Sequence, residues 1–139
     1  MSTEQNRAHD RRFVEEVWSQ GNMSAVDEVL ANNYILHDPS RTIHGPEGFK
    51  QFVSMFRSAF PDLHMTIEDQ IAEGDKLVRR FKVHGTHQGE LQDIPPTGKQ
   101  VTVSGILISR YENGKLAEDW SNFDALGMLQ QLGVIPAMG

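Results

Sequence analysis

Cysteine is absent from the 139-residue sequence. The protein therefore has no disulfide bonds, no thiolate zinc sites, no iron–sulfur clusters and no cysteine nucleophile. The sequence also lacks GxGxxG, GxSxG, HExxH and the phosphate-binding GxxxxGK motif, which serve nucleotide binding, serine hydrolysis and zinc proteolysis. None of the six histidines is followed by another four residues later, so a metal site has little support. We expect neither a metal nor an organic cofactor.

Positive charge is scarce as well, because 13 lysines and arginines stand against 19 aspartates and glutamates, a net charge of −6. Surfaces that bind nucleic acids need an excess of basic side chains, so we expect no nucleic-acid partner. No apolar run approaches the roughly 20 residues that span a bilayer. Residues 1–12 are polar and lack the apolar core of a signal peptide. These absences favour a cytoplasmic protein that does not bind a membrane.

The first half of the sequence has the apolar spacing of α-helices. Helices are predicted over 7–20, 24–32 and 45–60, and residues 1–8 are expected to form a loose polar terminus. The clearest helical period belongs to the third helix, whose apolar positions are Phe49, Phe52, Val53, Phe56 and Phe60.

The second half changes to the two-residue alternation of β-strands. The predicted strands cover 63–71, 77–87, 101–111 and 115–123, with a short strand earlier at 34–37 and a last helix at 124–133. Helices followed by antiparallel strands are typical of the α+β class. We expect a single domain over residues 1–139, in which a curved antiparallel sheet wraps around three helices and leaves a pocket between them.

The dipeptide Asn113-Gly114 lies between two predicted strands and favours a two-residue hairpin turn. This turn pairs Glu112 with Lys115, and the pairing decides which side chains share a face of the sheet. One face then holds Leu107, Tyr111, Trp120, Asn122 and Asp124, and the other holds Ile106, Ile108, Ala117, Asp119, Ser121 and Phe123. A β-bulge in this hairpin would reverse the assignment on one side.

Several polar side chains occur where the alternation requires apolar ones. Asp69, Arg79 and His87 occupy alternate positions that are otherwise apolar in their strands. Burial of an unpaired charge is unfavourable. Asp69 and Arg79 therefore form a structural ion pair, lie on a misassigned face, or belong to a functional site. Asp124 is a candidate for catalysis and equally for the N-cap of the last helix. His37 and His87 are candidates for the same site or ordinary residues of a strand edge and a loop.

A series of short motifs extends over residues 10–135 in a fixed order. They include Tyr34-Ile35-Leu36-His37-Asp38-Pro39, Gly45-Pro46-Glu47-Gly48-Phe49, Ala59-Phe60-Pro61-Asp62-Leu63, Gly85-Thr86-His87-Gln88-Gly89 and Trp120-Ser121-Asn122-Phe123-Asp124. Together they resemble the SnoaL-like polyketide cyclase family, a branch of the nuclear transport factor 2-like superfamily. The resemblance implies a cone-shaped α+β barrel with a largely apolar pocket.

The resemblance also implies a reaction and the residues that carry it. Characterised members resemble intramolecular aldol cyclases of polyketide esters that need no cofactor and often form homodimers. An aspartate on the late strands acts there as general acid and base, and this role is carried over to Asp124. His37 and His87 match polar positions of the pocket, while Trp120 and Asn122 match lining positions.

Two functions remain open at this point. The first is a cyclase or isomerase that abstracts a proton next to a carbonyl group of a hydrophobic ligand, with Asp124, His87 and His37 as catalytic residues. The second is a small-molecule-binding module without catalysis. In both, the ligand would contact Trp18, Phe52, Phe56, Arg79, Trp120 and Asn122. The apolar outer face with Ile106, Ile108 and Phe123 predicts a homodimer.

Overall fold

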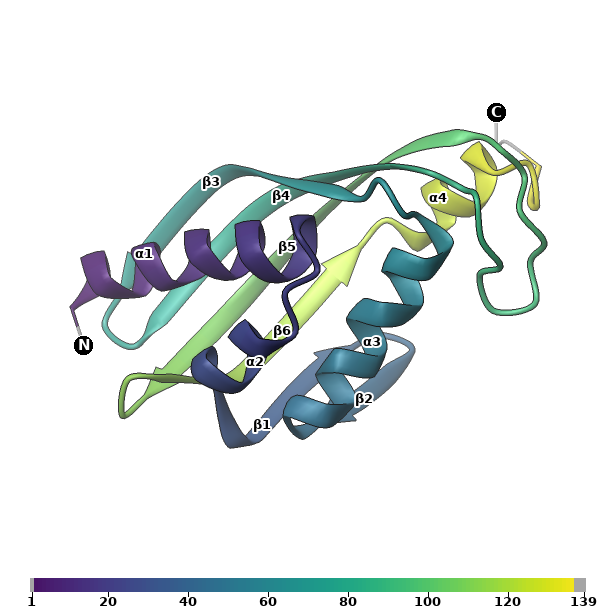
Figure 1. Ribbon diagram of the computed structural model, residues 1–139. Helices are drawn as coiled ribbons and strands as arrows, with labels where there is room; N and C mark the ends of the chain where they lie inside the picture. Colours follow the sequence, from purple (N-terminus) through teal and green to yellow (C-terminus); the bar gives the residue numbers. More distant parts are fainter. Residues whose placement is uncertain (1, 137–139) are drawn as a thin grey trace.

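The computed structural model describes residues 2–136, which form helices on one side of a curved six-stranded sheet (Figure 1). The helical elements are α1 (Thr3–Phe13), the π-helix η1 (Val14–Ser19), α2 (Ser24–Val29), α3 (Gly45–Ala59) and α4 (Ala125–Gln131). The strands are β1 (Leu30–Asp38), β2 (Arg41–His44), β3 (His64–Glu73), β4 (Lys76–Thr86), β5 (Gln100–Glu112) and β6 (Lys115–Phe123). None of the helices in this part of the chain is long and apolar enough to cross a membrane.

The sheet has the strand order β2-β1-β6-β5-β4-β3. Neighbouring strands are antiparallel except β1 and β6, which run parallel. The predicted α+β class is confirmed, while the fully antiparallel sheet is corrected to a mixed one. Because β1 and β6 are far apart in the chain, no hairpin turn dictates their relative direction. The helices α1, α2 and α3 cover the concave face of the sheet, and α4 lies at one end (Figure 1).

The first helix begins inside the segment that was expected to be loose. The Ser2 hydroxyl accepts a hydrogen bond from the Gln5 amide (3.1 Å), and the Gln5 side chain accepts one from the Ser2 amide (2.8 Å). This reciprocal cap satisfies amide groups that a helix start otherwise leaves without partners. Asn6 and Asp10 on the same helix are buried. The prediction of a loose terminus is therefore wrong for the described residues from Ser2 onward.

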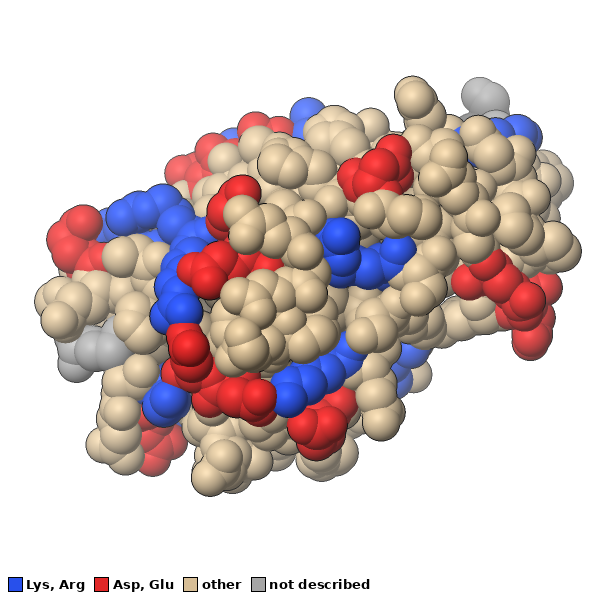
Figure 2. Space-filling view, in the orientation of Figure 1, with Lys and Arg blue, Asp and Glu red and all other residues tan. Residues whose placement is uncertain are grey.

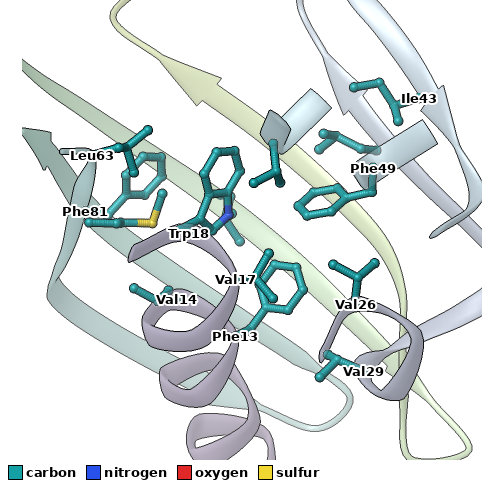
Figure 3. Packing of buried hydrophobic residues seen from close by; sticks show 14 of the residues in the cluster. Phe13, Val14, Val17, Trp18, Val26, Val29, Ile43, Phe49, Leu63 and Phe81 are labelled. Atoms are coloured by element: carbon teal, nitrogen blue, oxygen red, sulfur yellow. The ribbon is translucent and has the colours of Figure 1, made fainter. Parts of the chain in front are cut away.

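Aromatic side chains fill the space between α3 and the amino-terminal helices (Figure 3). Phe49 meets Phe13, Trp18 and Tyr34 at ring-centroid distances of 5.3, 5.8 and 5.6 Å. This agrees with the helical period predicted for α3, which directs Phe49 and Val53 into the core. The cluster joins α1, η1, α3 and β1 into one core.

Charged side chains of opposite sign alternate over the helical side of the molecule (Figure 2). Arg12 at the end of α1 pairs with Glu16 at 2.6 Å and also with Glu28 on α2. Lys50 on α3 pairs with Asp27 on α2 at 2.8 Å. Each such exposed pair contributes little stability by itself. The pairs link α1 to α2 and α2 to α3.

The hairpin of β5 and β6 begins in the predicted register and then departs from it. Glu112 pairs with Lys115 and Tyr111 with Leu116, but Arg110 pairs with Glu118, so Ala117 has no partner across the ladder. This bulge reverses the faces of the rest of β6. Consequently the predicted assignment is wrong beyond Leu116. Trp120 and Asn122 lie on the outer face with Ile106 and Ile108, while Asp119, Ser121 and Phe123 face the helices.

A second bulge reverses part of β3. Ile67 pairs with Phe81 but Asp69 pairs with Arg80, which leaves Glu68 as the extra residue. Asp69 is therefore exposed and lies 4.0 Å from Arg80 on the outer face. The predicted inward position of Asp69 is wrong, and Asp69 is not the partner of Arg79.

Candidate functional site: a cavity between sheet and helices

A cavity of about 90 Å³ lies between the concave face of the sheet and the helices. Most of its walls are aromatic and aliphatic side chains from η1, α3 and the inner face of β3 to β6. Among the described residues that line it, only Arg79, Asp119 and Ser121 have polar side chains. Apolar cavities with a few polar groups are typical of small-molecule sites.

Within residues 2–136, Asp119 supplies the only carboxylate that lines the cavity. It is 3% exposed, the Tyr34 hydroxyl donates a hydrogen bond to its Oδ2 (2.6 Å), and the Ser109 hydroxyl donates one to its Oδ1. Burial raises the pKa of Asp119 to about 6, although the two hydrogen bonds and the nearby Arg79 favour the charged form. Burial also raises the pKa of Tyr34, so its hydroxyl stays protonated and donates a hydrogen bond to Asp119.

Arg79 is the one cationic residue in the described part of the cavity wall and is 2% exposed. Its Nε lies 3.7 Å from Asp10 Oδ1, and its Nη1 lies 3.6 Å from the sulfur of Met65. The guanidinium also lies over the ring of Phe81 at 5.3 Å. Asp10 in turn accepts a hydrogen bond from Gln70 Nε2 (2.9 Å). Arg79 thus lies on the inner face as its strand parity predicts, with Asp10 as its nearest acidic neighbour.

Three predicted aromatic contacts lie in the cavity wall. Trp18, Phe52 and Phe56 all line the cavity. Trp18 meets Phe49 edge to face at 5.8 Å (Figure 3). It also meets Phe52 edge to face at 6.0 Å. The carbonyl oxygens of Trp18 and Ser19 accept hydrogen bonds from Arg57 Nη1 at 2.7 and 3.0 Å, which holds the end of η1. A π-helical turn often occurs at functional sites, and here it carries Trp18.

Asp124, the predicted catalytic aspartate, lies outside the cavity wall. It is exposed, and its Oδ1 accepts a hydrogen bond from the Gly127 amide (2.8 Å) as the N-cap of α4. Of the two roles that the sequence left open, the structure shows the cap.

The other predicted polar residues also lie away from the cavity. His37 stacks on Trp120 at 5.6 Å, and its Nε2 lies 2.7 Å from Glu118 Oε2, all on the outer face. Asn122 is exposed on the same face. The predicted pocket positions of His37, Trp120 and Asn122 are therefore wrong. Trp120 and Asn122 face outward because of the bulge at Ala117 in β6, and His37 lies on the outer face of β1, paired with Trp120.

His87 is fully buried but does not line the cavity. Its ring packs against Phe60 at 5.4 Å, and its Nδ1 accepts a hydrogen bond from the Thr97 amide (3.2 Å). The backbone amide of His87 donates to the Lys99 carbonyl (2.9 Å). His87 thus anchors the loop between β4 and β5, which is a structural role.

Sequence reasoning missed Asp119 as a cavity residue because strict alternation places it outside. The available signal is the adjacent pair Leu116 and Ala117, since two consecutive apolar residues break the alternation where the bulge occurs. Across residues 2–136, no group of three or more histidine, aspartate or glutamate side chains is arranged to hold a metal ion.

Residues 8–132 match the family model of the SnoaL-like polyketide cyclases. The chain belongs to this family. Nogalonic acid methyl ester cyclase of Streptomyces nogalater is 30% identical over 123 residues, which cover 84% of this chain and 89% of that protein. Aklanonic acid methyl ester cyclase DauD of Streptomyces sp. (strain C5) is 30% identical over 131 residues, which cover 88% of this chain and 78% of that protein.

Solved structures agree with the family assignment. TsrD from Streptomyces laurentii has a TM-score of 0.88 at 28% identity, covering 97% of this chain and 99% of TsrD. The SnoaL-like family and its nuclear transport factor 2-like fold, both expected from the motifs, are thereby confirmed. Membership of the family establishes the fold, but the reaction depends on the residues of this protein's own cavity.

Proposed function

We propose that the protein catalyses an intramolecular aldol-type ring closure of a polyketide-like ester in its cavity, with Asp119 as general acid and base. The observation that supports this most directly is a buried carboxylate in the wall of a largely apolar cavity, where burial raises its pKa to about 6. A general base works best when its pKa lies near the working pH. The role that the family resemblance implied for Asp124 is thus proposed for Asp119.

The proposed reaction conserves every atom of the ligand. The Asp119 carboxylate takes a proton from a carbon next to a carbonyl group, and the C–H electron pair moves to the carbonyl oxygen as an enolate. The enolate carbon then bonds to a second carbonyl carbon of the same molecule. The oxygen of that second carbonyl receives the proton back from Asp119. The product is an isomer of the substrate.

Ring closure requires a bent conformation of the substrate, and the aromatic wall of the cavity would hold the substrate in it. We propose that Trp18, Phe52 and Phe56 contact the flat apolar part of the ligand. Binding in one cavity holds the two reacting carbons close together. This lowers the entropy that the ligand must lose to reach the transition state.

The function is tested with the esters that the relatives' names specify. Purified protein is incubated with nogalonic acid methyl ester and with aklanonic acid methyl ester, and the products are separated by liquid chromatography with mass detection. The expected result is a new compound of unchanged mass whose formation rate scales with protein concentration. Tight binding of an ester without any such product would instead support the binding module without catalysis.

The pH dependence of the reaction follows from the state of Asp119. Only the ionised carboxylate accepts a proton, so kcat/KM should fall as the pH drops through about 6 and level off above it. Initial rates measured between about pH 5 and 8 with one ester check this. A profile that is flat across this range would exclude Asp119 as the base.

The outer face of the sheet supports a second proposal, that the protein forms a homodimer. Ile71, Ile106, Ile108 and Trp120 on this face are 61%, 51%, 40% and 38% exposed, and large exposed apolar patches usually mark interfaces. Phe123, predicted as part of this patch, faces inward instead and meets Phe56 at 6.0 Å.

The dimer is tested by placing charge in the apolar patch. The double variant Ile106→Asp/Ile108→Asp should sediment as a monomer at micromolar concentration while the unchanged protein sediments as a dimer. Ser104→Asp on the same strand and face is the matched control and should remain dimeric, since Ser104 is not part of the patch. An unchanged protein that is already monomeric would contradict the proposal.

A further inference from the structure

The reaction proposed above creates a negative charge on the ligand, and the histidines and the asparagine that the sequence assigned to the site do not line the cavity. The enolate oxygen needs a donor that faces it inside the cavity, because stabilisation of such an oxyanion is commonly the largest contribution to catalysis. His37 and Asn122 lie on the outer face, and His87 anchors a loop. The inner face must supply this donor from another position.

Arg79 has donors that the protein itself does not use fully. A guanidinium has five N–H groups in a planar fork. Among residues 2–136 its one recorded hydrogen-bond acceptor is the sulfur of Met65, a weak acceptor at 3.6 Å. Its Nε is buried without a hydrogen-bond partner, since Asp10 Oδ1 at 3.7 Å is beyond hydrogen-bond distance. A buried cation with so few partners is unfavourable unless a ligand completes its shell.

The sheet register brings Arg79 and Asp119 to neighbouring rows of the same inner face. Arg79 pairs with Leu107, which pairs with Ser121, and the next row runs from Leu77 through Ser109 to Asp119. Adjacent strands lie about 4.8 Å apart, so the two residues are separated by one strand. A ligand carbonyl in the cavity can therefore lie between the carboxylate and the guanidinium, both of which line it.

We propose that Arg79 is the receptor for the enolate oxygen that forms when Asp119 takes the proton. Before transfer the negative charge belongs to Asp119, and after transfer it belongs to the ligand oxygen. The guanidinium keeps its charge throughout, so the transfer moves the anion towards a cation with free donors rather than into an apolar wall. This inference rests on the proposed function. It assigns Arg79 a catalytic role, whereas the sequence predicted only that Arg79 contacts the ligand.

The test uses a β-diketone, 1-phenylbutane-1,3-dione, whose enolate absorbs at longer wavelength than its neutral form. It is bound to the Asp119→Asn variant, so that ionisation of the probe is read without competition from the carboxylate. We expect the bound diketone to ionise at a pH at least about one unit lower than in water, a tenfold preference for the anion that suits a charged hydrogen bond. Adding Arg79→Gln should abolish this shift, while adding Arg80→Gln should preserve it, since Arg80 is the exposed neighbour on the outer face.

A second measurement needs no change at Arg79 and covers the case in which that variant fails to fold. The unchanged protein is titrated at about pH 5, where Asp119 is largely protonated, with benzoate and with methyl benzoate. Benzoate, which presents an anionic oxygen, should bind about tenfold more tightly than its neutral ester. If neither the enolate nor benzoate is favoured over its neutral counterpart, Arg79 is only the structural partner of Asp10. Turnover of a polyketide ester would still support the proposed function in that case.

Discussion

Replacing Asp119 by asparagine should lower kcat by about 10²- to 10⁴-fold, the usual contribution of a positioned general base. An amide has nearly the shape of the carboxylate but cannot accept the proton. The hydroxyls of Tyr34 and Ser109 now donate to different oxygens of Asp119. In the variant, one hydroxyl can donate to the amide oxygen and the other can accept a hydrogen bond from the amide N–H. The variant should therefore fold and bind the ester while losing turnover, as measured by single-turnover mass analysis together with a binding titration.

Asp124→Asn provides the matched control for this experiment. The chemical change is the same, but Asp124 caps α4 from an exposed position outside the cavity. Asparagine is as good an N-cap as aspartate, so both stability and kcat should stay close to those of the unchanged protein. The reverse pattern, with turnover lost at Asp124 and kept at Asp119, would return the catalytic role to the position that the family motif implied.

Truncation of Phe49 to alanine should lower the free energy of unfolding by about 3–5 kcal/mol, the range measured for buried phenylalanines. The ring is 2% exposed and meets Phe13, Trp18, Tyr34 and Phe52 within 6.2 Å. Removing it leaves a void among four aromatic rings that rigid helices and strands cannot close. Denaturation in urea, with the midpoint and slope compared to those of the unchanged protein, measures the loss.

Phe56→Ala on the same helix is the comparison for Phe49→Ala. Both side chains line the cavity, but Phe49 is fully buried while Phe56 is only partly buried at the margin of the core. Truncation of Phe56 should therefore cost about 1–2 kcal/mol. The loss of binding free energy for the ligand should exceed the loss of unfolding free energy in this variant. Equal losses of stability at the two positions would mean that Phe49 is not the centre of the core.

The types of the secondary-structure elements were predictable because the spacing of apolar residues in each element is a local property of the sequence. The spacing of the phenylalanines in α3 and the alternation in β4 and β5 depend only on residues close in sequence. The hairpin pairing of Glu112 with Lys115 followed from Asn113-Gly114 for the same reason. The parallel pairing of β1 with β6 was not predictable, since it joins distant segments that no turn connects.

The site was predictable only in part, and the difference has one physical cause. Phe52, Phe56 and Arg79 line the cavity as expected, because α3 and β4 have no bulge near these positions. Trp18 also lines the cavity, although the turn that carries it is π-helical rather than α-helical. Asp119 was missed since the face of a side chain on β6 depends on every pairing between it and the turn. One unpaired residue changes that face without changing any local preference.

The unpaired Ala117 also determines which positions of related sequences are equivalent to the catalytic residues of this protein. A relative that lacks this residue keeps the same ladder beyond it and presents the same side chains to the cavity, although an alignment shows a gap. A relative of equal length with an unbroken strand presents its counterparts of Trp120 and Asn122 instead, although it aligns without a gap. Along β6, therefore, matching columns of an alignment correspond to matching places in the cavity only when the bulge is aligned as well.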